Sequence, residues 1–274
     1  MTSFGEAVAA ASARIGRTDA VALATHAWGV TRAWLVSHDR DTLAAALAQR
    51  YDTLVEQRQQ GSPVAYLTGL REFYGRAFAV SPAVLIPRPE TELIVEAALA
   101  RLPKAGRLLD LGTGSGAIAV TVACERPYAT VVATDVSGAA LAVARDNARR
   151  HGASVDFRPG NWFEPVDAAR FDIIVSNPPY VAALDPHLGQ GDLRFEPGVA
   201  LSDGSPDGLA SLKTIISGAQ SHLLPGGWLL LEHGHDQGER CARLLEAAGF
   251  VERVAMADLA GLSRVAGGRL QRPG

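Results

Sequence analysis

The stretch of sequence that decides the fold is Asp110-Leu111-Gly112-Thr113-Gly114-Ser115-Gly116. Its first two residues end a short apolar run at 107–111 that predicts a strand. Its last residue begins a segment at 116–125 that predicts a helix. Glycines at such a junction let the backbone turn tightly and approach a ligand closely. The stretch therefore predicts a ligand-binding loop between the first strand and the first helix of an α/β sheet.

Strands and helices continue to alternate after this loop. Further strands are expected at 130–134, 155–158, 171–176 and 228–232, and helices at 138–151 and 236–248. Such alternation is typical of a parallel sheet with helices on both faces. We therefore expect an α/β fold of the doubly wound, Rossmann-like kind.

The residues before the loop have a different organisation. Residues 3–60 show helical spacing of apolar side chains, for example at Leu43, Leu47 and Tyr51, and predict a small bundle whose last long helix spans about 41–59. Proline and glycine then interrupt residues 62–90, between short alternating segments that predict a β-hairpin. The domains are accordingly expected at 1–62 (helical), 63–90 (hairpin linker) and 91–274 (catalytic).

Composition narrows the class of protein. The chain has 274 residues and a formal net charge of −3, with a pI of about 6.2, which disfavours binding of duplex nucleic acid by charge alone. Cys124 and Cys241 lack metal-ligand spacing, and no metal site is expected. The N-terminal residues show no basic segment followed by an apolar core, so we expect no signal peptide, and no apolar run reaches the ~20 residues that span a bilayer. We expect a cytoplasmic protein that does not enter the membrane.

Two carboxylates indicate which ligand the loop binds. Asp110 stands at the end of the first expected strand, where it would repel the diphosphate of NAD but attract an ammonium group. Asp135 ends the second expected strand, where a carboxylate can accept hydrogen bonds from both ribose hydroxyls; it could instead cap a helix. Together they favour an adenosine ligand with an ammonium group, as in S-adenosyl-L-methionine. Asn161 and Trp162 follow the third strand and could contact adenine, although a tryptophan that fills the core is an equal alternative.

The motif Ser176-Asn177-Pro178-Pro179-Tyr180 follows the fourth expected strand and indicates the chemistry. Its prolines leave neighbouring carbonyls free, so the Asn177 side-chain oxygen and the Pro178 carbonyl can both accept from one NH2 group. Tyr180 can stack on the planar group that carries this nitrogen. Because an amide nitrogen is a poor nucleophile, holding it in line with a sulfonium methyl can contribute ~7–11 kcal/mol. The motif predicts methylation of a planar amide or amine, with Asn177, Pro178 and Tyr180 as catalytic residues.

The chain resembles the HemK/PrmC release factor glutamine methyltransferases over nearly its whole length. The resemblance rests on the glycine loop, on Asn177 to Tyr180, and on five further strings: 63–69 (PVAYLTG), 71–73 (REF), 85–92 (LIPRPETE), 191–197 (GDLRFEP) and 231–234 (LEHG). One departure is Asn161, where the family often has an acidic residue.

The resemblance implies a class I S-adenosylmethionine-dependent methyltransferase domain with a seven-stranded, mostly parallel sheet, joined by a hairpin to a helical substrate-recognition domain. It implies transfer of a methyl group to the side-chain nitrogen of the glutamine in the Gly-Gly-Gln motif of release factors 1 and 2, leaving S-adenosyl-L-homocysteine. With the residue analysis, it gives two sets of site residues. The expected cofactor contacts are Asp110, Gly112, Thr113, Gly114, Ser115, Gly116, Asp135, Asn161, Trp162 and Asn177, and the expected substrate contacts are Asn177, Pro178, Pro179 and Tyr180.

Three other functions fit parts of the sequence. A nucleic-acid adenine or cytosine amino methyltransferase could use the same Asn-Pro-Pro-Tyr motif, but it must flip a base and hold a phosphate backbone. An inactive scaffold would not need the intact motifs, and an NAD-dependent oxidoreductase has no use for Asn177 to Tyr180. Glu196 and Arg194 could form a structural ion pair or contact the substrate, and the sequence does not choose between these.

Overall fold

The computed structural model describes residues 2–271, and this part of the chain forms two compact units. One unit contains residues 2–70 together with the later segment Gln190–Phe195. The other contains Arg71–Gly189 and residues 196–271. The chain therefore leaves the second unit after Gly189 and returns to it at Glu196.

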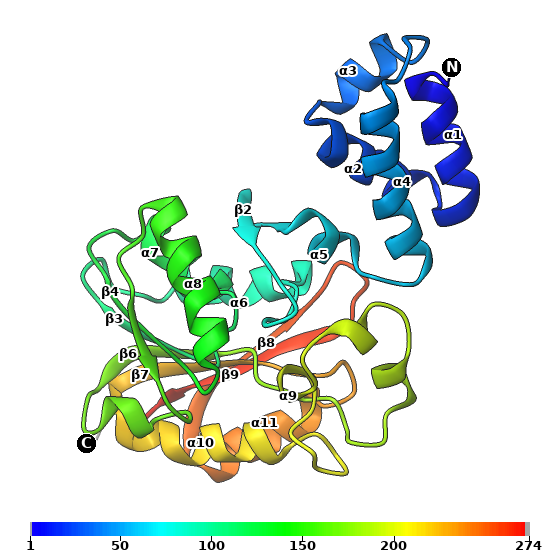
Figure 1. Ribbon diagram of the computed structural model, residues 1–274. Coiled ribbons are helices and arrows are strands. Elements are labelled where there is room, and N and C mark those ends of the chain that lie inside the picture. The colour runs from blue at the N-terminus through cyan, green and yellow to red at the C-terminus, as the bar shows by residue number, and fades with distance from the viewer. Residues whose placement is uncertain (1, 272–274) are drawn as a thin grey trace. The chain divides into compact units, whose positions relative to one another are not determined.

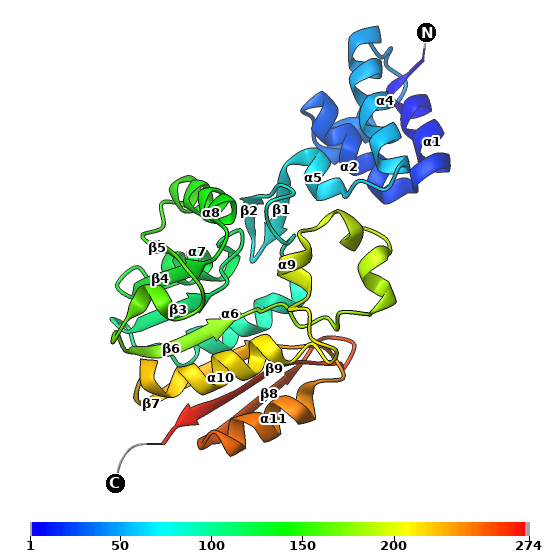
Figure 2. The same cartoon turned by 60° about the horizontal axis from the view of Figure 1, so that its bottom comes forward.

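The first unit is a small helical bundle, as the sequence predicts. Its core is formed by residues such as Leu23, Tyr51 and Val55, and the Tyr51 hydroxyl donates to the Ala20 carbonyl at 2.9 Å. Figure 2 shows α1, α2 and α4 lying against one another. The helices are α1 (Phe4–Ile15), α2 (Arg17–Trp28), α3 (Arg32–Ser37), α4 (Ala45–Gln59) and α5 (Val64–Thr68).

The segment Gln190–Phe195 is held in the first unit by specific contacts. Arg58 pairs with Asp192 at 2.7 Å and with Asp19 at 2.6 Å. Gly61, at a φ of +100°, leaves room for the segment, because a Cβ there would lie 1.8 Å from Nη2 of Arg194. The helical unit is therefore completed by residues that lie more than a hundred positions later in the chain.

The second unit is built on a seven-stranded sheet with the order β5-β4-β3-β6-β7-β9-β8. All neighbours from β5 to β7 are parallel, while β9 is antiparallel to both β7 and β8. The strands are β3 (Arg107–Leu111), β4 (Thr130–Asp135), β5 (Asp156–Pro159), β6 (Phe171–Ser176), β7 (Leu223–Glu232), β8 (Phe250–Ala257) and β9 (Ser263–Leu270). The predicted hairpin is present as the separate pair β1 (Leu70–Phe73) and β2 (Arg76–Ala79).

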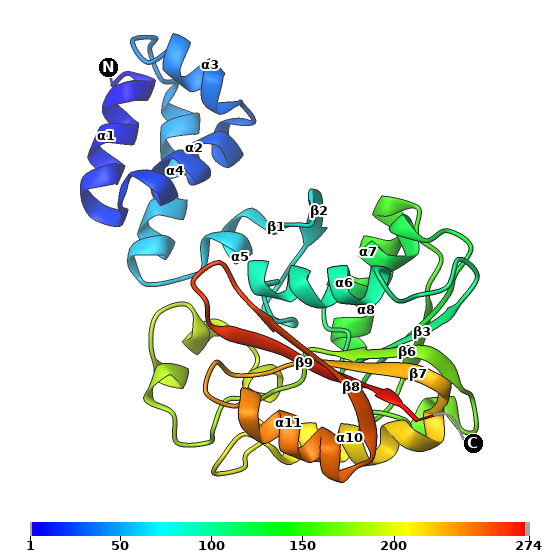
Figure 3. The same cartoon turned by 180° about the vertical axis from the view of Figure 1, so that it is seen from behind.

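Helices cover both faces of the large sheet (Figure 1). One face is covered by α6 (Glu92–Leu99), α7 (Ala117–Glu125) and α8 (Gly138–His151), and the other by α10 (Ala210–His222) and α11 (Gly238–Ala247). Figure 3 shows α6 and α11 on opposite sides of β9. Shorter helical turns lie at η1 (Pro89–Thr91), η2 (Glu164–Val166), η3 (Pro186–Gly189) and η4 (Leu193–Phe195), and a one-turn helix, α9, at Gly198–Leu201.

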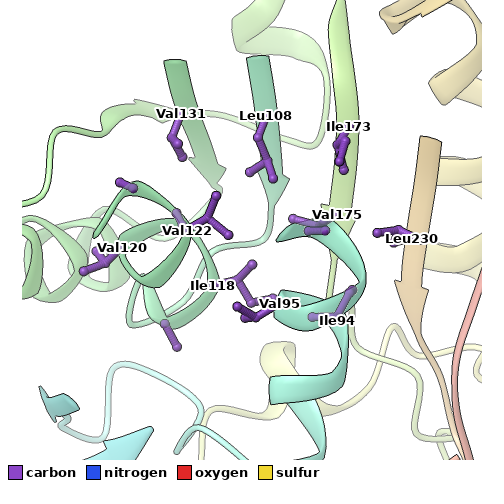
Figure 4. Close-up of a cluster of buried hydrophobic side chains, with 14 of the residues drawn as sticks. Ile94, Val95, Leu108, Ile118, Val120, Val122, Val131, Ile173, Val175 and Leu230 are labelled. Carbon is purple, nitrogen blue, oxygen red and sulfur yellow. The ribbon is translucent and has the colours of Figure 1, made fainter. Parts of the chain in front are cut away.

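The apolar strand runs are explained by this double coverage. Leu108 belongs to the core beneath α6 and α7, whereas its neighbour Leu109 belongs to the core beneath α10 and α11. Figure 4 shows the first of these cores, with Ile94 and Ile118 beside Val175. Because both faces of a parallel sheet are buried, its strands read as continuous apolar runs.

The expected elements of the second unit are largely confirmed, with differences at four elements. The fifth expected strand, at 228–232, begins earlier, at Leu223, because β7 continues through Pro225 and two glycines beside β6. Helix α10 and strands β8 and β9 were not identified from the residue pattern, although the family resemblance implies seven strands. In the part of the chain that the structure describes, no helix combines the length and apolarity that crossing a bilayer demands.

Candidate active site

A cavity of about 330 Å³ opens at the carboxyl ends of the central strands. It lies where the chain order of the strands reverses, between β3 and its neighbours β4 and β6, which is the usual ligand position in open α/β sheets. Its wall is formed at the ends of four strands, with Gly114 after β3, Asp135 at the end of β4, Trp162 after β5 and Asn177 after β6. The sheet thus brings together residues from the four motifs that the sequence singles out.

The glycine loop follows β3 and turns through left-handed backbone. Gly112 has a φ of +69°, and a Cβ there would approach the Trp162 ring to 3.4 Å. The amide of Gly114 donates to Oδ2 of Asp135 at 2.8 Å, which fixes the loop against β4. Gly116 does not line the cavity; it precedes α7, and a Cβ at this position would crowd Ala144.

Asp110 lies beneath this loop, buried and outside the cavity wall. Its Oδ2 accepts from the Thr113 hydroxyl at 2.6 Å, while its buried Oδ1 has no hydrogen-bond partner within residues 2–271. Burial raises the pKa of Asp110 to about 7, and the nearby Asp135 charge acts in the same direction. An unpaired buried oxygen of this kind is costly. Because Thr113, which bonds to Asp110, lines the cavity and Asp110 does not, Asp110 can favour a cationic ligand group only through its charge. The site therefore suits a ligand with an ammonium group.

Asp135 retains acceptor capacity toward the cavity. One of its oxygens accepts from Gly114 and the other from the amide of Ser137, each at 2.8 Å. A carboxylate offers about four lone-pair positions, so two more hydroxyl groups can still be bound. Burial raises the pKa of Asp135, while the two amide hydrogen bonds lower it. The helix N-cap role that Asp135 could have taken belongs to Ser137, which accepts from the amide of Ala140.

Trp162 and Asn161 both line the cavity. Trp162 has a φ of +45°, an uncommon backbone conformation for a bulky residue, and its carbonyl accepts from the Thr134 hydroxyl at 3.0 Å. Strain of this type is often found beside binding sites. The ring therefore forms part of the cavity wall next to Gly112, although it also contacts the apolar core.

The Asn-Pro-Pro-Tyr loop after β6 is held from several sides. Ser176 donates to the Leu111 carbonyl at 2.7 Å, and the Asn177 amide nitrogen donates to the Thr91 hydroxyl at 3.2 Å. Asn177 and Pro179 line the cavity, whereas Pro178 is buried and, like Tyr180, lies outside the wall.

The Tyr180 hydroxyl is bonded to a buried carboxylate and is not available as a general base. It donates to Oε1 of the buried Glu232 at 3.1 Å, and the ring packs against the core beneath α10. Burial, followed by the charge of Glu232, raises the pKa of Tyr180 far above its usual range. Tyr180 therefore remains protonated and cannot serve as a general base.

Several residues of the site were not among the predicted contacts. Leu85, Pro87 and Thr91 reach the cavity from the segment before α6, Pro197 from the N-cap of α9, and Val199 from α9 itself. The strings at 85–92 and 191–197 already stand out in the sequence, but their contacts depend on the fold.

Glu196 pairs with a different arginine from the one considered in the sequence. Its side chain is fully buried and bonds to the Arg88 guanidinium and to the amide of Ile86, the latter at 2.9 Å. Arg194 instead donates to the Gln60 carbonyl at 3.0 Å. Glu196 is therefore a structural tie between the two segments that border the cavity.

The fold and the site together define a Rossmann-like methyltransferase. The methyltransferase small domain model matches residues 89–190, and the PrmC N-terminal domain model matches residues 5–69. The structure is similar to that of a methyltransferase from Pyrococcus furiosus, with a TM-score of 0.54 at 19% identity over 80% of this chain and 98% of that one.

Two relatives of similar length indicate which family of methyltransferases the chain belongs to. The chain is 56% identical to the release factor glutamine methyltransferase of Xylella fastidiosa (strain Temecula1), over 96% of each chain. It is 53% identical to the enzyme of the same name from Bordetella pertussis, over 93% of this chain and 95% of that one. The chain belongs to the release factor glutamine methyltransferase family.

Proposed function

We propose that this protein transfers a methyl group from S-adenosyl-L-methionine to the side-chain amide nitrogen of the glutamine in the Gly-Gly-Gln motif of class I release factors. The observation that carries the proposal is the position of Asn177. Its side chain lines the cavity at the end of β6, and its amide nitrogen is already bonded to Thr91. Its oxygen is thereby left to accept from an NH2 group.

The residues around the cavity suit this cofactor. Asp110 places a buried carboxylate beneath the glycine loop, where its charge favours the ammonium group, Asp135 has acceptor capacity for the ribose hydroxyls, and Trp162 offers a flat wall for the adenine. When bound, the cofactor supplies an electrophilic methyl group on a sulfonium centre. Asn161 presents a carbonyl oxygen that can accept from the adenine amino group, as the acidic residue common in the family would.

The chain's own groups would act by positioning the substrate. The Asn177 oxygen and the Pro178 carbonyl would each accept one hydrogen of the glutamine NH2 group, which orients the nitrogen lone pair. Positioning of this kind can contribute ~7–11 kcal/mol to a reaction between two bound groups. No strong base is needed, because the methylated nitrogen becomes acidic and can lose its proton afterwards. Pro179, and the Tyr180 ring after a small rearrangement, would contact the planar amide.

Release factors 1 and 2 are the proposed partners, and the cytoplasm, where they act, is the proposed location. The helical unit would recognise the release factor. Methylation of a nucleic-acid amino group is the alternative, because the same two acceptors suit an exocyclic amine. The net charge of −3 gives no support for a phosphate-binding face.

Mass spectrometry of a release factor tests the proposal. The factor is incubated with this protein and S-adenosyl-L-methionine, and the peptide containing Gly-Gly-Gln is analysed. A gain of one methyl group on the glutamine supports cofactor, reaction and substrate together. No gain, with cofactor binding measured separately by calorimetry, would refute the substrate and direct attention to nucleic-acid amino groups.

A further inference from the structure

Gln237 is a buried residue whose side chain joins three loops. It stands at the N-cap of α11, is 4% exposed and lies outside the cavity wall. Its Nε2 donates to the carbonyls of Tyr180 at 3.0 Å and of Asp207 at 3.1 Å, and its Oε1 accepts from the amide of Gly234 at 2.9 Å. Tyr180 ends the Asn-Pro-Pro-Tyr loop after β6, Gly234 follows β7, and Asp207 precedes α10. One side chain therefore ties the loop with the proposed substrate contacts to two neighbouring loops.

The partners of Gln237 leave its amide a single orientation. A carbonyl can only accept and a backbone N–H can only donate, so Nε2 must face the carbonyls of Tyr180 and Asp207, and Oε1 must face Gly234. These two carbonyls use both hydrogens of the NH2 group, while the Gly208 carbonyl lies farther away, at 3.5 Å. The backbone amide of Gln237 also donates to the Gly234 carbonyl at 2.8 Å. Gln237 is thus held in place at its backbone and at both ends of its amide group.

Gly208 allows the Tyr180 carbonyl to approach this amide closely. Gly208 has a φ of +64°, and a Cβ there would overlap the Tyr180 oxygen and lie 3.0 Å from Nε2 of Gln237. Any larger residue would push the carbonyl away from its donor. The glycine at 208 and the donor at 237 therefore serve the same contact.

The Tyr180 carbonyl matters because the two prolines before it make the loop stiff. Proline fixes its own φ and restricts the residue before it, and neither proline has an N–H through which the middle of the loop could be held. The loop therefore takes its position from its ends. At the first end, the Ser176 hydroxyl bonds to the carbonyl end of β3. At the other end, the bond to Glu232 holds the Tyr180 ring, and Gln237 holds the Tyr180 backbone.

We propose that Gln237 is a positioning residue for methyl transfer, which fixes the Tyr180 carbonyl and thereby sets where Pro179 and the Pro178 carbonyl lie relative to the substrate nitrogen. The inference rests on the proposed function and adds to it a residue outside the site. Pro179 lines the cavity, and the Pro178 carbonyl is one of the two proposed acceptors of the substrate NH2 group. Loss of Gln237 should therefore slow methyl transfer while cofactor binding stays nearly unchanged.

The substitution Gln237→Met removes both donors while keeping the length of the side chain. A misplacement of about 1 Å caused by a change far from the chemistry can cost about 100-fold in rate, so we expect kcat for release factor methylation to fall roughly 10- to 100-fold. The cofactor Kd, measured by calorimetry, should change little. The control is Gln220→Met, because Gln220 also donates to a backbone carbonyl, that of Ala248, but is exposed on α10. It should keep the wild-type kcat.

A pair of glycine substitutions moves the same carbonyl without changing Gln237. Gly208→Ala places a Cβ against the Tyr180 oxygen, and it should lower kcat by a similar factor. Gly204→Ala is the matched control, because Gly204 lies in the same segment with a φ of +79°, yet a Cβ there would meet nothing within 4 Å. It strains the backbone in the same way and should leave kcat unchanged.

The Tyr180 carbonyl can also be observed without turnover. Tyr180–Val181 is the only tyrosine–valine pair in the sequence. Tyrosine labelled with 13C at its carbonyl and valine labelled with 15N therefore give a single correlated NMR signal from this peptide bond. The carbonyl shift responds to hydrogen bonding, so Gln237→Met and Gly208→Ala should each move the signal, and the two control variants should leave it in place.

The two kinds of measurement decide the inference together. A wild-type kcat in Gln237→Met overturns it, as does a lowered kcat with an unmoved carbonyl signal or with an equal loss of cofactor binding. If Gln237→Met does not fold, the glycine pair decides, because equal rates for Gly208→Ala and Gly204→Ala would refute the inference. A wild-type protein that does not methylate glutamine refutes the proposed function instead, and the NMR signal still decides whether Gln237 fixes the Tyr180 carbonyl.

Discussion

Replacement of Asn177 by alanine removes both the proposed acceptor for the substrate and the hydrogen bond to Thr91, and the two losses have different sizes. The bond to Thr91 joins neutral groups at 3.2 Å, and such a bond contributes about 0.5–1.5 kcal/mol to stability. Removing one preorganised polar contact from a reacting group costs about 2.7–4 kcal/mol of transition-state stabilisation. We therefore expect kcat to fall roughly 10²- to 10³-fold, with a small decrease in the free energy of unfolding.

The assay should separate the two effects. The rate of methyl gain on a release factor is measured by mass spectrometry at saturating cofactor, cofactor affinity by calorimetry, and stability by urea titration. Asn161→Ala is the comparison, because it removes another amide that lines the same cavity. This comparison variant should weaken cofactor binding more than it lowers the saturated rate.

A kcat for Asn177→Ala within about threefold of wild type would refute the reasoning, since a lost contact worth 2.7 kcal/mol or more corresponds to roughly a hundredfold. A large fall in stability with a proportionate loss of cofactor binding would also count against it. That outcome would mean that Asn177 maintains the fold of the loop rather than holding the substrate.

Three further changes test other parts of the structure. Asp135→Ala should weaken cofactor binding by about two orders of magnitude in calorimetry, because it removes the proposed acceptor for the ribose hydroxyls and a hydrogen bond to a charged group contributes about 1.5–3 kcal/mol; unchanged affinity would exclude it from the cofactor site. Glu196→Ala should lower the free energy of unfolding, measured in urea, by about 2–3 kcal/mol, because it leaves the amide of Ile86 and the partly exposed Arg88 unpaired. A loss below about 0.5 kcal/mol would show that the bonds of Glu196 contribute little to stability. Gly61→Ala should speed the hydrogen exchange of the backbone amides of residues 190–195, because the new Cβ would meet Arg194. Cofactor affinity should not change. Unaltered exchange would show that the segment accommodates the methyl group.

The parts of the fold that could be predicted are those with continuous apolar strands. Strands β3 and β6 match their expected bounds because nearly all of their residues are buried, which gives each strand a run of apolar residues at its centre. Strand β8 escaped prediction because most of its residues are exposed and its pairing with β9 shifts register after Val251 and after Met256. An edge strand with such irregularities loses the alternation on which prediction depends.

The site residues also fall into those that the sequence could predict and those that it could not. Asp135 and Asn177 could be identified because Asp135 ends one strand and Asn177 follows another, and the carboxyl ends of parallel strands meet at one edge of the sheet. Thr91 and Glu232 could not, because their roles come from contacts with Asn177 and Tyr180, 86 and 52 residues away in sequence. No local pattern marks a threonine that accepts a hydrogen bond from a distant amide.

The placement of Gln190–Phe195 in the helical unit has a consequence for the order in which the protein can be completed during its synthesis. The N-terminal helices leave the ribosome first, yet Arg58 gains its partner Asp192 only after a further 134 residues have been made, a delay of roughly 7 to 27 s at ordinary elongation rates. In that interval the bundle exists without its last segment, with Arg58 paired to Asp19 alone. The helical unit emerges first but is therefore among the last parts to be completed. By the time it is complete, the strands and loops of the cofactor site up to β6 have already been synthesised.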